Sequence, residues 1–230
     1  MRKDCLMSLN SLLFHFYRSM DTHNFKEEIQ YSEEHKKVFN NFRYRMTGLY
    51  YVYNFIISQI SASRGDKILD IGCGNGKLLR SLYEKFGNEV QLYGIDHTVS
   101  IIRSAHELNS DLPIKFKIAN IEDIPYMDGT FDWVICTFVA HHMTTDGKAA
   151  IIQQARRVLK RGGKLIITDL GMPRHIWSRI FASINRFRCS MYAKNNMEIV
   201  EHYIHEKNMK IILKKTQFGL IDHIIAERVY

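Results

Sequence analysis

The segment from Ile68 to Leu78 constrains the fold of this 230-residue chain more than any other. It reads ILDIGCGNGKL, an apolar strand-like run followed by three alternating glycines and the start of a helical pattern. Glycine accepts a left-handed backbone and allows another molecule to approach the main chain where a Cβ would collide. The helix that follows presents free N–H groups at its first turn, which suits an anionic group. We therefore predict a nucleotide-binding turn over these residues.

The spacing of the glycines separates this turn from the dinucleotide-binding pattern. Gly72, Gly74 and Gly76 follow the order GxGxG, whereas the dinucleotide fingerprint places its third glycine one position later, where this chain has Lys77. A carboxylate, Asp70, stands two residues before the first glycine. The pattern therefore favours a ligand other than NAD.

Strand-like and helical segments alternate after this turn, which predicts a parallel sheet covered by helices on both faces. The chain ends differently, because two β-rich runs are separated by only four residues, and a connection that short permits only an antiparallel hairpin. We therefore expect an α/β fold whose sheet is mostly parallel, with one antiparallel strand near its edge. The predicted strands cover residues 67–71, 90–95, 114–119, 133–137, 164–169, 210–215 and 220–228, and the predicted helices cover 46–60, 77–86, 99–108, 147–160 and 196–207. A tight turn is predicted at Gly162-Gly163, just after the helix that ends in Lys160 and Arg161.

Two segments fall outside this alternation. Residues 1–45 mix aromatic, basic and acidic positions, and we interpret them as a helical N-terminal extension, a lid or substrate cap, ahead of a domain over residues 46–230. Residues 172–196 contain five basic and no acidic side chains, with apolar residues at near-helical spacing, which predicts a basic amphipathic helical insertion. Such a helix either closes over an apolar acceptor, touches a membrane surface, or simply buries one face and solvates the other.

Composition narrows the setting of the protein. The four cysteines form no CxxC pair, which indicates free thiols, and no apolar run is long enough to cross a bilayer or to resemble a secretory signal, so we expect a cytoplasmic protein. The formal charge of +8 would suit an anionic partner, but net charge alone speaks only of solubility and non-specific attraction.

A second candidate site residue ends the next predicted strand. Asp96 follows Gly76 by twenty residues, and a carboxylate there can accept hydrogen bonds from both hydroxyls of a ribose. The alternative is that Asp96 caps the helix that follows, a common use of aspartate.

Taken together, the motifs resemble those of class I S-adenosylmethionine-dependent methyltransferases with a type 11 methyltransferase domain, over roughly residues 67–169. Within that family they are similar to the ubiquinone and menaquinone biosynthesis methyltransferases. The resemblance implies a Rossmann-like, doubly wound, seven-stranded sheet with helices on both faces, and S-adenosylmethionine as cofactor. The motifs that carry it are the glycine loop, Asp96, the run Asn120-Ile121-Glu122-Asp123-Ile124-Pro125-Tyr126, the pair Phe131-Asp132, and Leu159-Lys160-Arg161-Gly162-Gly163-Lys164-Leu165.

The resemblance also implies which residues contact the cofactor. Asp70 and the backbone of residues 72–76 would hold its amino acid end, Asp96 its ribose, and Asn120 and Ile121 its adenine, while Thr137 would face the sulfonium and its methyl group. On local pattern alone, Asn120 is equally a turn former, Ile121 ordinary core, and Thr137 an ordinary strand end. The implied contacts are Asp70, Gly72, Cys73, Gly74, Asn75, Gly76, Asp96, His97, Asn120, Ile121 and Thr137.

Two adjacent histidines, His141 and His142, follow the fourth predicted strand, at the mouth where open α/β sheets bind ligands. Either ring is a candidate general base or acceptor contact. The alternative is a neutral histidine that caps or packs against a helix, since methyl transfer from a sulfonium depends mainly on positioning. The sequence shows no metal-binding constellation.

We therefore predict an enzyme that transfers a methyl group to a small, hydrophobic or aromatic acceptor. A lipid-like acceptor, reached through peripheral membrane contact, is one form that this acceptor could take. Nucleic acid is disfavoured as a partner, because no nucleic-acid module or arginine-rich tail is present. The alternatives are an RNA or protein methyltransferase and a non-catalytic nucleotide-binding relative of the fold. The sequence leaves the oligomeric state and the identity of the acceptor open.

Overall fold

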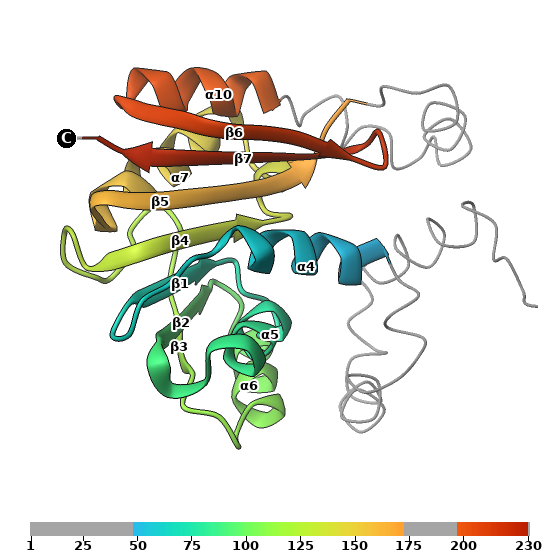
Figure 1. Ribbon diagram of the computed structural model, residues 1–230, viewed down its shortest axis with the longest axis vertical. Helices are drawn as coiled ribbons and strands as arrows, with labels where there is room; N and C mark the ends of the chain where they lie inside the picture. Colours follow the sequence, from blue (N-terminus) through green and yellow to red (C-terminus); the bar gives the residue numbers. More distant parts are fainter. Residues whose placement is uncertain (1–47, 173–196, 230) are drawn as a thin grey trace, which may run out of the picture. The chain divides into compact units, whose positions relative to one another are not determined.

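A computed structural model describes residues 48–172 and 197–229 (Figure 1). The chain divides into two units, residues 1–59 and 60–230. The first unit contributes one described helix, α4 (Gly48–Gln59), and the predicted extension over residues 1–45 lies outside the described residues. The predicted insertion over residues 172–196 also lies outside them, apart from its first residue. All that follows concerns the second unit.

The second unit is built on one seven-stranded sheet, with strand order β3-β2-β1-β4-β5-β7-β6. β1 to β5 pair in parallel, and β7 pairs antiparallel with both β5 and β6. The predicted mostly parallel sheet with one reversed strand next to its edge is therefore confirmed. The strands are β1 (Lys67–Ile71), β2 (Gln91–Asp96), β3 (Lys115–Ile118), β4 (Phe131–Thr137), β5 (Leu159–Leu170), β6 (Met209–Gln217) and β7 (Ile221–Arg228).

Helices cover both faces of the sheet. On one face, a Cβ built at Gly94 of β2 would lie 2.8 Å from the Leu79 side chain of a helix, so glycine at this position lets the helix approach the strand. The neighbouring Ile95 points to the opposite face, where it joins the main buried cluster with other helices. The helices are α5 (Lys77–Phe86), α6 (Val99–Leu108), α7 (Thr145–Val158) and α10 (Met197–Glu206), with short 3-10 turns at Gly87–Glu89 and Ala140–His142.

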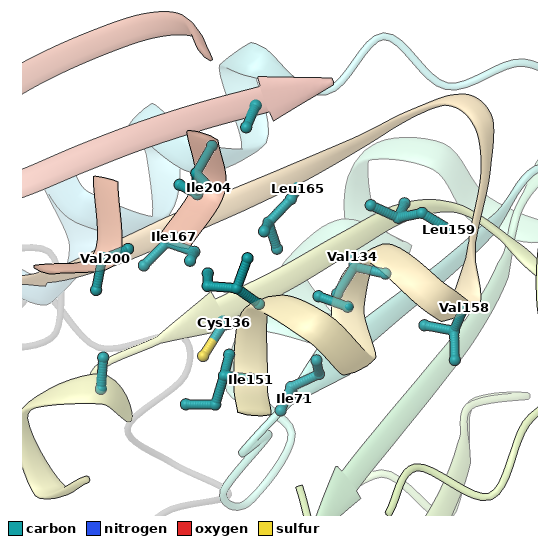
Figure 2. Close-up of a cluster of buried hydrophobic side chains, with 14 of the residues drawn as sticks. Ile71, Val134, Cys136, Ile151, Val158, Leu159, Leu165, Ile167, Val200 and Ile204 are labelled. Atoms are coloured by element: carbon teal, nitrogen blue, oxygen red, sulfur yellow. The ribbon is translucent and has the colours of Figure 1, made fainter. Parts of the chain in front are cut away.

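The main hydrophobic core lies between the sheet and helices α7 and α10. Figure 2 shows Val134 of β4 and Ile167 of β5 gathered with Ile151 of α7 and Val200 of α10, all of them nearly inaccessible to solvent. β4 and β5 bury both faces, which explains why their sequences read as continuous apolar runs without alternation. This core holds the sheet in place, and the sheet in turn positions the loops at its carboxyl edge.

The junction between α7 and β5 differs from the prediction. The helix ends at Val158 instead of Lys160, and β5 begins directly at Leu159. The guanidinium of Arg228, on the last strand, donates hydrogen bonds to the carbonyl oxygens of Arg156, Arg157 and Leu159, and so ends the helix through a partner about 70 residues away.

The prediction for the residues after α7 was also wrong in part. Lys160 does not compensate the helix end, because its Nζ lies 2.7 Å from Oδ1 of Asp132. The predicted glycine turn falls inside β5, where Gly162 has a φ of 74° and the pairing with β4 shifts between Phe131 and Trp133. The other predicted boundaries fall within two residues of the observed ones.

The order of the strands locates the functional edge of the sheet. From β1 the chain first adds β2 and β3 on one side and then crosses back to add β4 and β5 on the other. The connections after β1 and β4 therefore diverge, and open α/β sheets bind ligands outside the carboxyl ends of strands at such a switch point. The topology directs attention to the loops that follow β1, β2, β4 and β5.

Candidate functional site

The glycine loop after β1 turns through three residues with left-handed backbone. The φ angles are 71° at Gly72, 54° at Gly74 and 79° at Gly76. A Cβ at Gly72 would collide with the side chain of Val139, and one at Gly76 would lie 2.6 Å from the ring of Phe116. At Gly74, in contrast, a Cβ would meet nothing within 4 Å. The two outer glycines are therefore required by packing inside the protein, whereas the middle one leaves open space beside the main chain.

Backbone hydrogen bonds hold this loop against the end of β2. The amides of Gly72 and Cys73 donate to the carbonyl of Ile95 at 2.8 and 2.9 Å, and the amide of Gly74 lies 3.3 Å from Oδ2 of Asp96. The loop and the carboxylate at the end of the next strand thus form one connected unit. Two residues that the sequence places 22 positions apart are brought into hydrogen-bond distance.

Asp70 is a buried carboxylate at the carboxyl end of β1. Its side chain belongs to β1, the residue is 3% exposed, and its Oδ1 has no hydrogen-bond partner among the residues that the structure describes. Burial raises the pKa of this carboxyl group well above its ordinary value, and the nearby charge of Asp96 raises it further. A buried acceptor of this kind is costly unless a donor or a cation satisfies it. The arrangement therefore suits a positively charged ligand group.

Thr137 supplies a second orphaned oxygen at the same edge. Its Oγ1 is buried and also lacks a hydrogen-bond partner within the described part of the chain. β4 pairs with β1 so that Ile135 stands opposite Asp70, and side chains two residues apart on a strand point to the same face. Asp70 and Thr137 therefore lie on the same face of neighbouring strands.

Asp96 supports the start of the helix that follows β2, which is the alternative that the sequence left open, while its contact with a ribose stays a prediction. It ends β2 and is 8% exposed; its Oδ1 accepts a hydrogen bond from the amide of Thr98 at 3.0 Å, which supports the start of α6. Each carboxylate oxygen has about two lone-pair sites, so acceptor capacity remains after the contacts with Thr98 and Gly74. The neighbouring His97 has a largely exposed ring whose Nδ1 lies 3.5 Å from Oδ1 of Asp96.

The two residues predicted to contact adenine show the structural roles that were their alternatives. Asn120 is exposed, and its Oδ1 accepts a hydrogen bond from the amide of Glu122 at 3.1 Å, which makes a local turn. Ile121 is buried in the main core. Both residues come shortly after the carboxyl end of β3, so they lie at the edge of the sheet where the site was predicted. Their contact with a cofactor stays a prediction.

Two further predicted contacts lie within the glycine loop. Cys73 is buried, and burial raises the pKa of its thiol, which keeps the sulfur protonated and unreactive. The carbonyl of Asn75 accepts a hydrogen bond at 3.0 Å from the side chain of Asn109. Both residues therefore contribute to the loop through packing and the main chain.

The histidine pair divides into one buried and one exposed ring. His141 is 4% exposed, and its ring Nδ1 lies 2.7 Å from Oδ1 of Asp169, while His142 is exposed with its ring centroid 3.8 Å from that of His141. The other carboxylate oxygen of Asp169 accepts a hydrogen bond from the amide of His141 at 3.0 Å. The carboxylate thus orients the imidazole and leaves Nε2 as the ring nitrogen available for proton transfer.

Asp169 was missed by the sequence analysis. It is the next-to-last residue of β5, is fully buried, and also accepts a hydrogen bond from the amide of Leu170 at 2.6 Å. A signal was present, because Asp169 follows an apolar run near the end of β5, as Asp96 follows one at the end of β2. A carboxylate at the carboxyl end of a predicted parallel strand is a candidate site residue wherever it occurs.

Among the described residues, no group of three or more histidine, cysteine or acidic side chains is arranged to hold a metal ion. In the same part of the chain, no helix has both the length and the apolar character needed to span a bilayer.

Comparison with known proteins gives the same picture for the fold. A family model described as a methyltransferase domain matches residues 62–217. The chain resembles the PH0226 protein of Pyrococcus horikoshii OT3 with a TM-score of 0.68 and 18% identity, covering 83% of this chain and 93% of that one. It resembles the geranyl diphosphate C-methyltransferase of Streptomyces coelicolor A3(2) with a TM-score of 0.65 and 12% identity, covering 85% and 84%.

Relatives with higher identity match a shorter stretch. The O-methyltransferase resE of Aspergillus sclerotiorum is 33% identical over 122 residues, which is 51% of this chain and 45% of that protein. The ubiquinone/menaquinone biosynthesis C-methyltransferase UbiE of Neisseria meningitidis is 31% identical over 125 residues, or 53% and 50%. The chain thus spans about half the length of the curated relatives that it matches.

Proposed function

The chain belongs to the family of methyltransferase domains, and from this premise we propose that it binds S-adenosylmethionine at the loop after β1 and transfers the methyl group to a small molecule. The observation that carries the proposal is the buried carboxylate of Asp70, whose Oδ1 lacks a hydrogen-bond partner in the described part of the chain, beside a glycine loop with open space at Gly74. When bound, S-adenosylmethionine supplies an electrophilic methyl group on a positively charged sulfur.

The residues present fit this compound part by part. The α-ammonium group of its amino acid end is a cation that would satisfy Asp70, and its carboxylate suits the N–H groups at the start of α5. Asp96 retains acceptor capacity for the ribose hydroxyls. We propose the further contacts of His97, Asn120, Ile121 and Thr137 as the family resemblance implies them.

We propose a small, hydrophobic or aromatic acceptor. The relatives are named as an O-methyltransferase and a quinone-pathway C-methyltransferase, and a structural neighbour is named as acting on geranyl diphosphate, which are all small-molecule enzymes. A cytoplasmic location, and a lid or peripheral membrane contact formed by residues 1–45 and 172–196, belong to the same proposal. The enzyme would act by holding the acceptor atom in line with the methyl group and excluding water.

The proposal is tested by incubating the full chain with labelled S-adenosylmethionine and fractionated cell extract. We expect label in a low-molecular-weight product, whose mass identifies the acceptor. Label in RNA or protein fractions would favour the macromolecular alternative, and no binding of S-adenosylmethionine by calorimetry would favour a non-catalytic relative.

Replacing Asp96 by alanine tests the ribose contact. The variant Asp96→Ala removes a carboxylate acceptor, and hydrogen bonds to charged groups contribute about 1.5–3 kcal/mol each, so we expect the Kd for S-adenosylmethionine to rise about 10- to 100-fold. Calorimetric titration measures this change. Asp96→Asn keeps one oxygen acceptor and should lose less affinity. An unchanged Kd in Asp96→Ala at an unchanged melting temperature would refute the ribose assignment.

We propose His141, oriented by Asp169, as the general base for acceptors that must lose a proton. The exchange His141→Asn should lower methyl transfer about 100-fold, a usual contribution of general base catalysis, while the Kd for S-adenosylmethionine stays within about twofold. His142→Asn, which changes the exposed neighbour, serves as the matched control. Equal losses in both variants, or a loss of cofactor affinity in His141→Asn, would contradict this assignment.

A further inference from the structure

The side chain of Asn109 connects the end of α6 to the glycine loop from behind. Asn109 is 3% exposed and directly follows the last residue of the helix. Its Nδ2 donates hydrogen bonds to the carbonyl of Ala105 at 2.8 Å and to the carbonyl of Asn75, 34 positions earlier in the chain, at 3.0 Å. A single buried amide group therefore joins two segments that are distant in sequence.

Capping of α6 explains only half of this arrangement. The backbone amide of Asn109 already donates to the carbonyl of Ala105 at 3.2 Å, and the side chain adds a second bond to the same carbonyl. A cap needs no more than this. The other N–H group of the side chain donates to the carbonyl of Asn75, which belongs to the peptide between Asn75 and Gly76, where the loop leads into α5.

Arg80 holds Asn109 in this orientation. Its Nε donates to Oδ1 of Asn109 at 3.0 Å, which fixes which end of the amide faces the loop. Its Nη2 donates to the carbonyl of Leu108 and to Oδ1 of Asp111, both at 2.6 Å. Arg80 is itself tied to the loop, because its backbone amide donates to the carbonyl of Gly76 at 2.9 Å. The loop, α5 and the end of α6 thus form a closed ring of hydrogen bonds.

The hydrogen bonds of Asn109 and Arg80 matter at this position because the loop that they hold is rich in glycine. Peptides flanked by glycines rotate more freely than others, and their ordering costs more conformational entropy. A rotation of the peptide between Asn75 and Gly76 would redirect the amides at the start of α5. Asn109 opposes this rotation through the Asn75 carbonyl, and its Nδ2 would lie 2.8 Å from a Cβ at Gly76, so the contact is tight.

We propose that Asn109, held by Arg80, is a positioning residue for cofactor binding: it fixes the glycine loop in the orientation that receives the amino acid end of S-adenosylmethionine. This inference rests on the proposed function, because it assigns a role toward the same ligand. It extends the binding machinery to two residues outside the strand-loop-helix motif, and neither of them needs to touch the ligand.

The substitution Asn109→Asp tests this role with little change in volume. The carboxylate still accepts from Arg80, but it replaces the donor with an oxygen facing two carbonyls. We expect the Kd for S-adenosylmethionine to rise about tenfold or more, and amide hydrogen exchange over residues 73–78 to accelerate, as follows from the loss of a buried hydrogen bond. Arg80→Met removes the guanidinium that orients Asn109 but keeps the side-chain amide of Asn109, and it should raise the Kd about threefold.

Arg228→Met is the matched control. Arg228 also donates to helix-end carbonyls, at the far end of α7, and its loss should lower the melting temperature without changing the Kd by more than about twofold. A Kd in Asn109→Asp within twofold of the wild type, with the wild type binding, would overturn the positioning role alone. Weakening in Arg228→Met as large as in Asn109→Asp would show general destabilisation and overturn it as well. Failure of the wild type to bind would overturn the proposed function itself. If Asn109→Asp does not fold, the Kd for S-adenosylmethionine and the amide hydrogen exchange over residues 73–78 are measured in Arg80→Met instead, and they decide in the same way.

Discussion

Replacement of Gly74 by valine is expected to abolish the binding of S-adenosylmethionine. A Cβ at this position would meet nothing within 4 Å inside the protein, so the side chain would project into the space where the ligand is proposed to lie against the loop. The φ of 54° is strained for any residue with a Cβ, which costs about 1–2 kcal/mol. Calorimetric titration should therefore show no detectable heat of binding, and Gly74→Ala should show an intermediate loss.

Gly129→Val separates the blocking of the ligand from the strain. Gly129 has a φ of 62° and also has nothing within 4 Å of a Cβ, but it lies before β4, at the opposite end of the strand from the candidate site. Both variants should lower the melting temperature by about 2–8 °C, as this amount of strain predicts for a domain of this size. Only Gly74→Val should lose binding. If the two lose binding equally, or if Gly74→Val binds normally, the ligand does not approach the loop at Gly74.

Most of the fold could be predicted because the patterns that determine it involve residues close together in the sequence. The loop after β1 carries a glycine pattern typical of a nucleotide-binding turn, and the alternation of strand-like and helical segments favours a parallel sheet. The reversed strand followed from a connection too short to cross the sheet. The carboxylates Asp70 and Asp96 could be named because each stands at a fixed place relative to the loop.

The parts that could not be predicted depend on long-range partners. The end of α7 is decided by Arg228, and the pairing of Lys160 with Asp132 appears only when β4 and β5 are side by side. Asn109 lies in the turn after α6, where asparagine is common, and only the fold brings it under the loop. Asp169 had a local signal that becomes specific once His141 is placed beside it.

The exchange Asp70→Asn is expected to change cofactor affinity and stability in opposite directions. The proposed role of Asp70 is to hold the ammonium group of S-adenosylmethionine, and the loss of one partner of a buried ion pair costs about 3–5 kcal/mol, so the Kd should rise by a factor of about 100 or more. Without ligand, the same carboxylate is a buried acceptor whose Oδ1 lacks a partner within the described residues. Its removal should raise the melting temperature by about 2–4 °C at neutral pH, which corresponds to about 1 kcal/mol.

The dependence on pH follows from the direction of the pKa shift. Because burial raises the pKa of Asp70 in the folded protein, the stability that this group contributes is present below the ordinary carboxyl pKa of 3.8 and is lost as the pH rises through the raised value. The advantage of Asp70→Asn should therefore shrink toward pH 4 and grow as the pH rises through the raised pKa of Asp70. Cofactor affinity of the wild type should fall as the pH is lowered, because protonation removes the partner of the ammonium, while the variant should show no such slope.

Asp132→Asn supplies the control for a carboxylate that has partners. Asp132 accepts from Lys160 and from the amide of Lys67 at 2.7 and 2.9 Å, so its replacement should lower the melting temperature and leave the affinity for S-adenosylmethionine unchanged. A binding carboxylate lowers the stability of the free protein and raises the affinity for the ligand, whereas a structural carboxylate raises the stability and leaves the affinity unchanged. The opposite signs of these two effects distinguish Asp70 from Asp132. If Asp70→Asn instead destabilises the free protein and binds the cofactor normally, Asp70 is part of the core, and the cation site must be sought elsewhere along the carboxyl edge of the sheet.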